Sequence, residues 1–193
     1  MPTWKEIIAR NPHHSEEYAA RWRRIAASGK DIFGEARLID ALVPRQARIL
    51  DAGCGTGRIG GWLSRRGHRV DGIDLDPVLI EHARQDYPEA TWEVGDLGID
   101  PLPQGRYDAV VCAGNVMGFI EADRRAAAVK NIARSLAPGG RAAVGFGAGR
   151  GWEFPDFLDT CRSAGLEVEH QYSTWDMRPF TRESDFLVAV LRS

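Results

Sequence analysis

Three glycines at alternate positions form the stretch of this sequence with the clearest capacity for chemistry. Gly53, Gly55 and Gly57 follow an apolar run that ends at Asp51, and a helical pattern that includes Ile59 begins directly after them. Glycine lets the backbone turn tightly and lets a ligand lie against the main chain, where a Cβ would intrude. The turn leads into a helix N-terminus, whose free N–H groups attract the negative or electron-rich end of a ligand. The stretch therefore predicts a site for a nucleotide-type ligand rather than a purely structural turn.

Further polar and small residues stand where later predicted strands end. Asp74 ends the second strand, where a carboxylate can accept both ribose hydroxyls of an adenosine. Asp96 follows the third strand and could accept from an adenine amino group, with Leu97 framing the ring. Ala113 and Asn115 belong to a loop of small residues after the fourth strand, where carbonyl groups could approach a ligand ammonium. These residues extend the predicted site beyond the glycines.

The elements that must position these residues alternate between strand and helix from Arg48 onward. Apolar runs predict strands over residues 47–50, 69–73, 91–94, 107–112, 142–146, 167–172 and 184–191. Strict alternation predicts a parallel sheet with helices on both faces, and the last two strands, with no helix between them, predict one antiparallel strand. The expected fold is therefore an α/β, doubly wound, mostly parallel seven-stranded sheet. Sheets of this kind bind ligands at the carboxyl ends of their strands.

The predicted helices between the strands carry recognisable boundary signals. Asp76-Pro77 places an acidic N-cap and an N1 proline before one helix. The spacing of apolar residues over 129–136 predicts a helix that Pro138-Gly139-Gly140 ends, and residues 152–164 read as another helix.

The first 45 residues are predicted to form a helical segment that precedes the α/β domain of residues 46–193 in one structural unit. Thr3 and Glu6 have the spacing of a capping box, and Ser15 is the expected N-cap of a second helix. A third helix is expected over residues 35–42.

Two interpretations of the aromatic and basic residues in this segment stay open. The aromatic side chains could pack on the sheet domain while the arginines are solvated. Alternatively they could cap a ligand pocket, with Tyr18, Trp22 or Arg37 near the cofactor.

Composition restricts the class of protein and its partners. The chain has 193 residues, enough for one domain with a real core, and its 27 acidic and 25 basic residues nearly cancel. No net field therefore favours nucleic acid or an anionic membrane. Three cysteines far apart, in no CxxC pair, argue against a disulfide framework or a zinc site. With no signal core at the start and no apolar run long enough to span a bilayer, we expect a soluble, cytoplasmic protein.

Five motifs in order resemble those of the class I S-adenosylmethionine-dependent methyltransferases. They are Leu50-Asp51-Ala52-Gly53-Cys54-Gly55-Thr56-Gly57, Gly72-Ile73-Asp74-Leu75-Asp76-Pro77, Gly95-Asp96-Leu97, Tyr107-Asp108-Ala109-Val110-Val111-Cys112 and Leu136-Ala137-Pro138-Gly139-Gly140. The resemblance implies that residues 53–57 wrap the methionine part of S-adenosylmethionine, Asp74 the ribose and Asp96 the adenine. The cofactor-binding residues expected on this basis are Asp51, Gly53, Gly55, Gly57, Asp74, Leu75, Asp96, Leu97, Ala113 and Asn115.

The chemistry implied by this resemblance is in-line displacement at the sulfonium methyl, which needs no metal and chiefly requires alignment and exclusion of water. A general base depends on the nucleophile. His170, Asp176, Glu121, His13 and His14 are open candidates, so no catalytic residue is assigned.

A small-molecule acceptor is expected, because Asn115 begins Asn-Val-Met-Gly and not the Asn/Asp-Pro-Pro-Tyr of many methyltransferases that act on nucleic-acid bases. The loops at residues 147–152 and 175–180 are expected to border the substrate.

Two other functions are kept as alternatives, and the oligomeric state is left open. Gly55, Gly57 and Gly60 also match the fingerprint of an NAD(P)-dependent oxidoreductase. A non-catalytic protein that binds S-adenosylmethionine as a regulator or scaffold would carry the same motifs as an enzyme.

Overall fold

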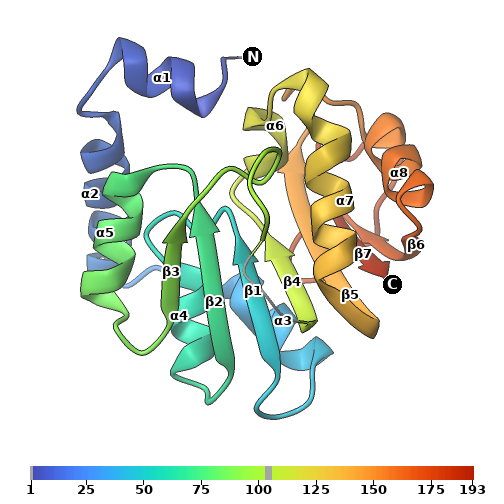
Figure 1. The fold of residues 1–193 in the computed structure, drawn as a ribbon, viewed down its shortest axis with the longest axis horizontal. Coiled ribbons are helices and arrows are strands. Elements are labelled where there is room, and N and C mark those ends of the chain that lie inside the picture. Colours follow the sequence, from blue (N-terminus) through green and yellow to red (C-terminus); the bar gives the residue numbers. More distant parts are fainter. Residues whose placement is uncertain (1, 103–105) are drawn as a thin grey trace.

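One seven-stranded sheet forms the centre of the molecule, with strand order β3-β2-β1-β4-β5-β7-β6 (Figure 1). The computed structural model describes residues 2–102 and 106–193; Met1, with which the expected N-terminal segment begins, lies outside them. The strands are β1 (Arg48–Ala52), β2 (Arg69–Asp74), β3 (Thr91–Val94), β4 (Tyr107–Cys112), β5 (Leu136–Gly147), β6 (Glu167–Tyr172) and β7 (Phe186–Arg192).

The strands β1 to β5 are parallel to one another, whereas β7 lies between β5 and β6 and is antiparallel to both. Residues 173–185, which join β6 to β7, contain no helix that could carry the chain across the sheet, and the two strands pair in the antiparallel direction. The predicted fold class is confirmed.

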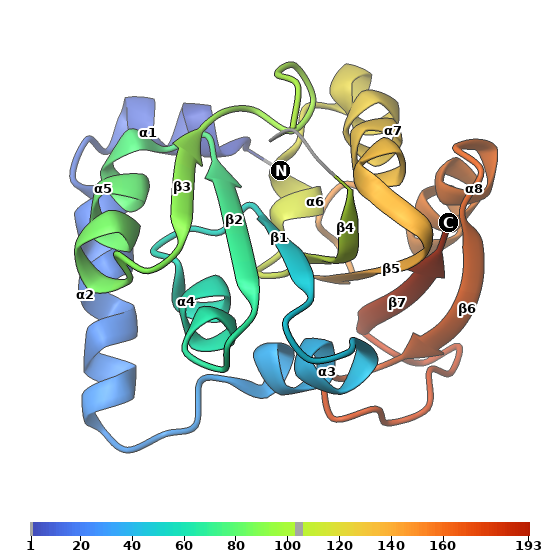
Figure 2. The same ribbon diagram turned by 60° about the horizontal axis from the view of Figure 1, so that its bottom comes forward.

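Helices cover both faces of the sheet (Figure 2). They are α1 (Trp4–Arg10), α2 (His14–Ala27), α3 (Gly34–Leu42), α4 (Arg58–Ser64), α5 (Pro77–Asp86), α6 (Val116–Phe119), the 3₁₀ helix η1 (Ala122–Arg124), α7 (Arg125–Ser135) and α8 (Phe154–Ser163).

Each face of the sheet has its own apolar core. Val129 and Ile132 of α7, with Phe157 of α8, pack on one face. Ile39 of α3 and Leu63 of α4 pack on the other. Such two-sided burial explains why consecutive residues of the central strands, Ile49-Leu50 in β1 and Val110-Val111 in β4, are apolar and fully buried.

Some helix and strand boundaries differ from those expected from sequence. The helix expected to reach residue 136 ends at Ser135, and β5 begins at Leu136 instead of residue 142, so that Pro138-Gly139-Gly140 lies inside the strand. The register of β5 against β4 jumps between Tyr107 and Ala109, which accommodates these residues in a bulge.

The start of α8 was also misplaced, because it begins at Phe154 instead of residue 152. Trp152 packs instead against Phe146 and Phe157, and this tertiary contact is not visible in a helical pattern. The short α6 and η1 were not predicted at all.

The expected N-cap role of Ser15 is wrong. The helix α2 begins at His14, and its N-cap His13 makes no side-chain capping bond. The Ser15 hydroxyl instead donates to the Asp76 carboxylate, a buried acceptor from elsewhere in the chain. The capping box of Thr3 and Glu6 and the capping of α5 by Asp76 are both confirmed.

Among the helices of residues 2–102 and 106–193, none has the length and apolar character needed to cross a membrane.

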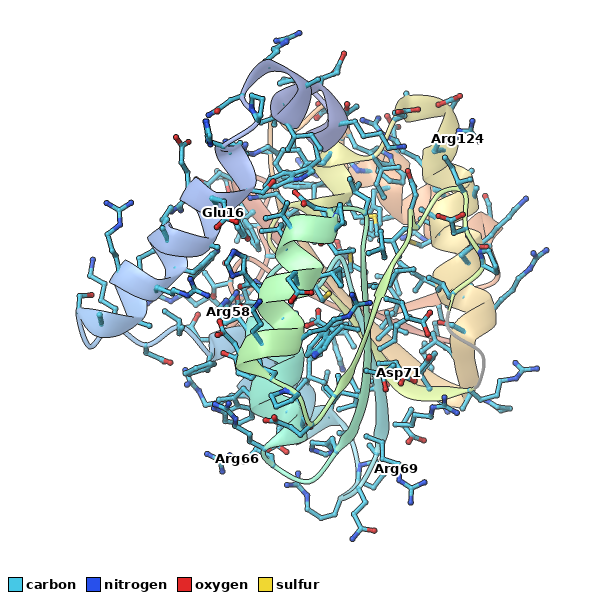
Figure 3. The ribbon with its side chains drawn as sticks, turned by 60° about the vertical axis from the view of Figure 1, so that its left-hand side comes forward. Glu16, Arg58, Arg66, Arg69, Asp71 and Arg124 are labelled. Atoms are coloured by element: carbon cyan, nitrogen blue, oxygen red, sulfur yellow. The ribbon has the colours of Figure 1, made fainter. Side chains whose placement is uncertain are left out.

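Charged side chains are found at both ends of the molecule: Arg124 lies at one end in Figure 3, and Arg66 and Arg69 at the other.

Candidate cofactor site

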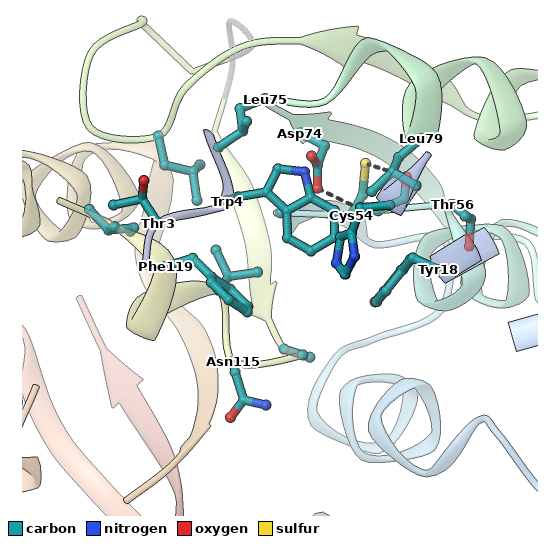
Figure 4. Close-up of a pocket in the computed structure, with 18 of the residues that line it drawn as sticks. Thr3, Trp4, Tyr18, Cys54, Thr56, Asp74, Leu75, Leu79, Asn115 and Phe119 are labelled. Atoms are coloured by element: carbon teal, nitrogen blue, oxygen red, sulfur yellow. Dashed lines mark hydrogen bonds between the residues drawn. The ribbon is translucent and has the colours of Figure 1, made fainter. Parts of the chain in front are cut away.

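A cavity of about 580 Å³ lies at the carboxyl ends of β1 to β4. The loops that follow these strands line one side of it, and residues of α1 and α2 line the other (Figure 4). The sheet therefore brings its strand-end residues together where parallel α/β sheets bind ligands.

The glycine loop contributes two of its three alternate glycines to the cavity. Gly53 and Gly55 line it, but Gly57 does not. All three have positive φ angles, of 79°, 54° and 75° respectively, and residues with a side chain rarely adopt such backbone angles. A Cβ on Gly55 would meet only the Tyr18 ring, at 3.7 Å, which is an ordinary van der Waals distance. The main chain at Gly55 is thus bare toward the cavity, which is the surface that a ligand needs.

Gly57 is required for a different reason. A Cβ there would lie 2.9 Å from the Cβ of Ala83 and 3.0 Å from the Trp92 ring. The residue lets α4 start close against α5 and β3, so the structure gives it a packing role.

Two carboxylates at strand ends differ in their access to the cavity. Asp51 is buried outside the lining and accepts a hydrogen bond from the Gly60 N–H at 2.8 Å. Asp74 lines the cavity and accepts from the N–H groups of Gly55 at 2.8 Å and Asp76 at 3.0 Å. Burial raises the pKa of Asp51 to about 7 and that of Asp74 to about 6. Asp74 is the acid placed to bind a ligand, and Asp51 supports the loop.

Leu75, Asp96 and Leu97 line the cavity beside Asp74. The Asp96 carboxylate accepts from the Lys5 ammonium at 2.7 Å and from the Gly98 N–H at 2.9 Å. Partial burial raises the pKa of Asp96, but these hydrogen bonds outweigh it and hold the pKa below its usual range. Asp96 is therefore an ionised acceptor that already has a cationic partner from α1.

Ala113 and Asn115 also line the cavity, at the end of β4. Asn115 has a φ of 64°, and its side-chain oxygen accepts from the Gly147 N–H at 2.8 Å. This bond joins the loop after β4 to the end of β5.

The N-terminal helices supply aromatic residues to the cavity. Trp4, His14, Tyr18 and Trp22 line it, whereas Arg37 pairs with Asp31 outside it. The pocket-capping interpretation therefore suits Tyr18 and Trp22 but not Arg37. Sequence reasoning placed Trp4 only among the N-terminal aromatics and did not name Lys5 as a site residue; both lie in a short capped helix.

Of the five candidates for a general base, His14 and Glu121 line the cavity, and His13, His170 and Asp176 do not. Arg150 brings the loop at residues 147–152 to the cavity. The segment 175–180 contributes none of the lining residues, so the structure does not support its expected place beside the substrate.

The three thiols are buried and free. Burial raises the pKa of Cys54 well above its usual value, although the residue touches the cavity. A thiol held protonated in this way is a poor nucleophile.

These groups fit S-adenosylmethionine. Each Asp74 oxygen accepts one N–H and retains capacity for a second hydrogen bond, which suits a ribose diol. The main chain at Gly55, where a Cβ would meet only the Tyr18 ring, suits the close approach of an aminoacyl chain, whereas a Cβ on Gly53 would collide with Val116 at 2.4 Å.

Comparison with known proteins identifies the family. Residues 49–140 match the model of a methyltransferase domain. The structure superposes with a TM-score of 0.92 on a TehB-like S-adenosylmethionine-dependent methyltransferase from Corynebacterium glutamicum, at 59% sequence identity over 94% of this chain and 98% of that one. The chain therefore belongs to the S-adenosylmethionine-dependent methyltransferases, whose cofactor is S-adenosylmethionine. The oxidoreductase interpretation of the glycines is wrong.

Two curated relatives are more distant. A dTDP-3-amino-3,4,6-trideoxy-alpha-D-glucopyranose N,N-dimethyltransferase of Streptomyces venezuelae is 30% identical over 77% of this chain. An S-adenosyl-L-methionine-dependent Diels-Alderase of a Neonectria species is 27% identical over 94% of this chain. The chain spans 60% and 72% of the length of these two relatives.

Proposed function

We propose that this protein transfers the methyl group of S-adenosylmethionine to a small molecule by in-line displacement. The observation that carries the proposal is the cavity itself: about 580 Å³ between the strand ends and the N-terminal helices must hold both cofactor and acceptor. Cavities of roughly 300–1,000 Å³ are typical of sites for small molecules. The near-balance of 27 acidic and 25 basic residues gives no general attraction for nucleic acid.

The cofactor would supply an electrophilic methyl group on a sulfonium. The chain's own residues then have to bind and orient it: Gly53 and Gly55 along the methionine part, Asp74 at the ribose, and Asp96 with Leu97 at the adenine. Exclusion of water falls to Trp4, Tyr18 and Phe119, whose rings line the cavity.

A proton acceptor for the nucleophile has two candidates that line the cavity, His14 and Glu121. Burial raises the pKa of Tyr18, so its phenol stays protonated near neutral pH. Tyr18 is thus suited to donate a hydrogen bond to an acceptor molecule and unsuited to act as the base.

The relatives support a small acceptor but do not identify the molecule. The Streptomyces relative is named for a dTDP-linked amino sugar. The Neonectria relative is named as an enzyme that depends on S-adenosylmethionine but forms rings, which keeps a cofactor-binding protein without methyl transfer as the second candidate.

The proposal is tested by incubating the protein with S-adenosylmethionine and separate pools of small amines, thiols, phenols and carboxylic acids. Formation of S-adenosylhomocysteine together with a methylated small product is the expected result. The Asp74→Asn variant is the matched control and should turn over far more slowly at limiting cofactor. Methylation confined to RNA or protein would contradict the proposal, and tight cofactor binding without any methylated product would favour the second candidate.

A further inference from the structure

Asp76 uses its two carboxylate oxygens for different tasks. Oδ1 accepts from the N–H groups of Val78 at 2.9 Å and Leu79 at 3.4 Å, which caps α5. Oδ2 accepts from the indole N–H of Trp4 at 2.7 Å and from the hydroxyl of Ser15. Asp76 is only 1% exposed. One buried carboxylate therefore joins the start of α5 to both N-terminal helices.

Trp4 lines the cavity from α1. Its ring meets Tyr18 edge-on at a centroid distance of 5.5 Å and Phe119 of α6 at 5.7 Å. In Figure 4, Trp4 lies between Asp74 on one side and Phe119 on the other. The indole thus bridges α1 and α6 next to the acid expected to bind the ribose.

Lys5 ties α1 to the adenine end of the same site. Its ammonium lies 2.7 Å from the Asp96 carboxylate, the expected acceptor for the adenine amino group. Among the described residues, the hydrogen bonds from α1 to the α/β domain are those of Trp4 and Lys5. The Lys5 pair is partly exposed and should be weak, so the buried Trp4 bond is the stronger of the two.

The helix α2 has separate attachments. Glu16 bonds to His82 at 2.9 Å, and Arg23 bonds to His82 at 2.9 Å and Asp86 at 3.4 Å, all on α5. The body of α2 therefore keeps its bonds to α5 when the Asp76 bonds break, whereas α1 keeps only the partly exposed Lys5 pair as a hydrogen bond to the α/β domain among the described residues.

We propose that Asp76 is a positioning residue that holds α1 closed over the bound cofactor, so that breaking its bond to Trp4 limits cofactor release. The inference rests on the proposed function for the place of the cofactor. In this proposal Asp76 holds α1 in addition to capping α5, and Trp4 and Lys5 cover the adenosine part of the cofactor from the side of α1.

The test uses Asp76→Asn in the full chain. The asparagine oxygen can still accept from the N–H groups of α5, because Asn is as good an N-cap as Asp. Its NH₂ group then faces the Trp4 N–H, so two donors meet and the bond is lost. Release of S-adenosylhomocysteine, followed by stopped-flow displacement, should become about tenfold faster or more, as expected for a buried bond to a charged group.

Limited trypsin digestion without ligand provides a second measurement. Cleavage after Lys5 and Arg10 in α1 should accelerate in Asp76→Asn, because local opening of α1 exposes these sites. Cleavage after Arg21 in α2 should stay unchanged, since α2 keeps its bonds to α5.

Trp4→Phe is the matched variant, because it removes the indole N–H and keeps an aromatic ring. It should accelerate release and α1 cleavage in the same direction, and the double variant should release no faster than Asp76→Asn, since the Trp4 bond is already lost in Asp76→Asn. Unchanged release and cleavage in both variants would overturn the proposal. Faster release in Asp76→Asn alone would also overturn it, because Asp76 would then act through its bond to Ser15 and not through Trp4. A wild-type protein that binds no S-adenosylhomocysteine would contradict the proposed function, while the ligand-free digestion would still decide whether Asp76 holds α1.

Discussion

The Asp74 carboxylate accepts a hydrogen bond from the backbone N–H of Gly55 at 2.8 Å, so the acid that ends β2 is bonded to the loop that follows β1. Two groups expected to contact different parts of the cofactor are therefore parts of one hydrogen-bonded unit. Such a contact fixes the carboxylate before a ligand arrives and lowers the entropy cost of binding.

Replacement of Asp74 by alanine should weaken binding of S-adenosylhomocysteine by about 1.5–3 kcal/mol, because a charge-assisted acceptor for the ribose is lost. The change also frees the N–H of Gly55, so the melting temperature should fall by a few degrees. Calorimetry measures the binding, and thermal unfolding measures the stability. An unchanged dissociation constant in a folded Asp74→Ala variant would mean that another residue binds the ribose.

The affinity for S-adenosylhomocysteine should depend on pH through Asp74. Since its folded pKa is about 6, Asp74 is mostly ionised at pH 7 and mostly protonated at pH 5. If the ionised form binds the ribose, affinity should fall about tenfold between these values, following the ionised fraction. Asp74→Asn cannot titrate and should bind weakly at both. Parallel pH profiles for the wild type and this variant would refute the assignment.

Substitution of Gly55 by valine should abolish cofactor binding. The new side chain would enter the cavity toward Tyr18, and a β-branched residue would be strained at a φ of 54°. Cys54→Ala is the matched control in the same loop and should bind nearly as well as the wild type, because no function is assigned to that thiol. Cofactor binding by a folded Gly55→Val protein would show that the ligand does not lie against this loop.

Gly57 should behave differently, since its Cβ position faces Ala83 and Trp92 and not the cavity. Gly57→Ala should lower the free energy of unfolding by about 1–3 kcal/mol through overpacking and strain. Gly67→Ala is the matched control: its φ is 89°, but nothing lies within 4 Å of a Cβ there, so it reports the strain alone. Urea unfolding of the two variants separates the cost of overpacking from the cost of backbone strain. Equal losses in both would rule out the packing role of Gly57.

The buried Asp51 should make stability fall as pH rises. Its folded pKa of about 7 lies above the ~3.9 of an exposed aspartate, so the folded state binds the proton more tightly. The stabilisation is complete below about pH 4 and lost by about pH 7, and corresponds to at most about 4 kcal/mol. Asp51→Asn keeps an acceptor for the Gly60 N–H and should lack this loss. The difference in unfolding free energy between wild type and variant, measured from pH 4 to 8, should therefore change sharply over that range; a constant difference would contradict the assignment.

The sequence by itself determined the fold class and the strand ends at which a ligand site must lie. Strands that alternate with helices can bury all their apolar residues only in a sheet that is covered on both faces. The glycines with positive φ are required locally, by the tight turn after β1. For this reason Gly53, Gly55, Asp74 and Asp96 could be predicted to share one edge of the sheet, and the structure places all four on the cavity.

Only the tertiary structure decided which residues face that cavity from outside the motifs. Trp4, Lys5 and Ser15 reach Asp76 and Asp96 from more than 60 positions away in the chain, and no local pattern encodes which acceptor a side chain will meet. The structure also decided that two residues of the glycine motif do not face the cavity. Gly57 packs against neighbouring elements, and Asp51 accepts a hydrogen bond within the α/β domain. Spacing along the chain fixes backbone shape through local sterics, whereas the direction of each side chain is set by the packing of elements distant in sequence.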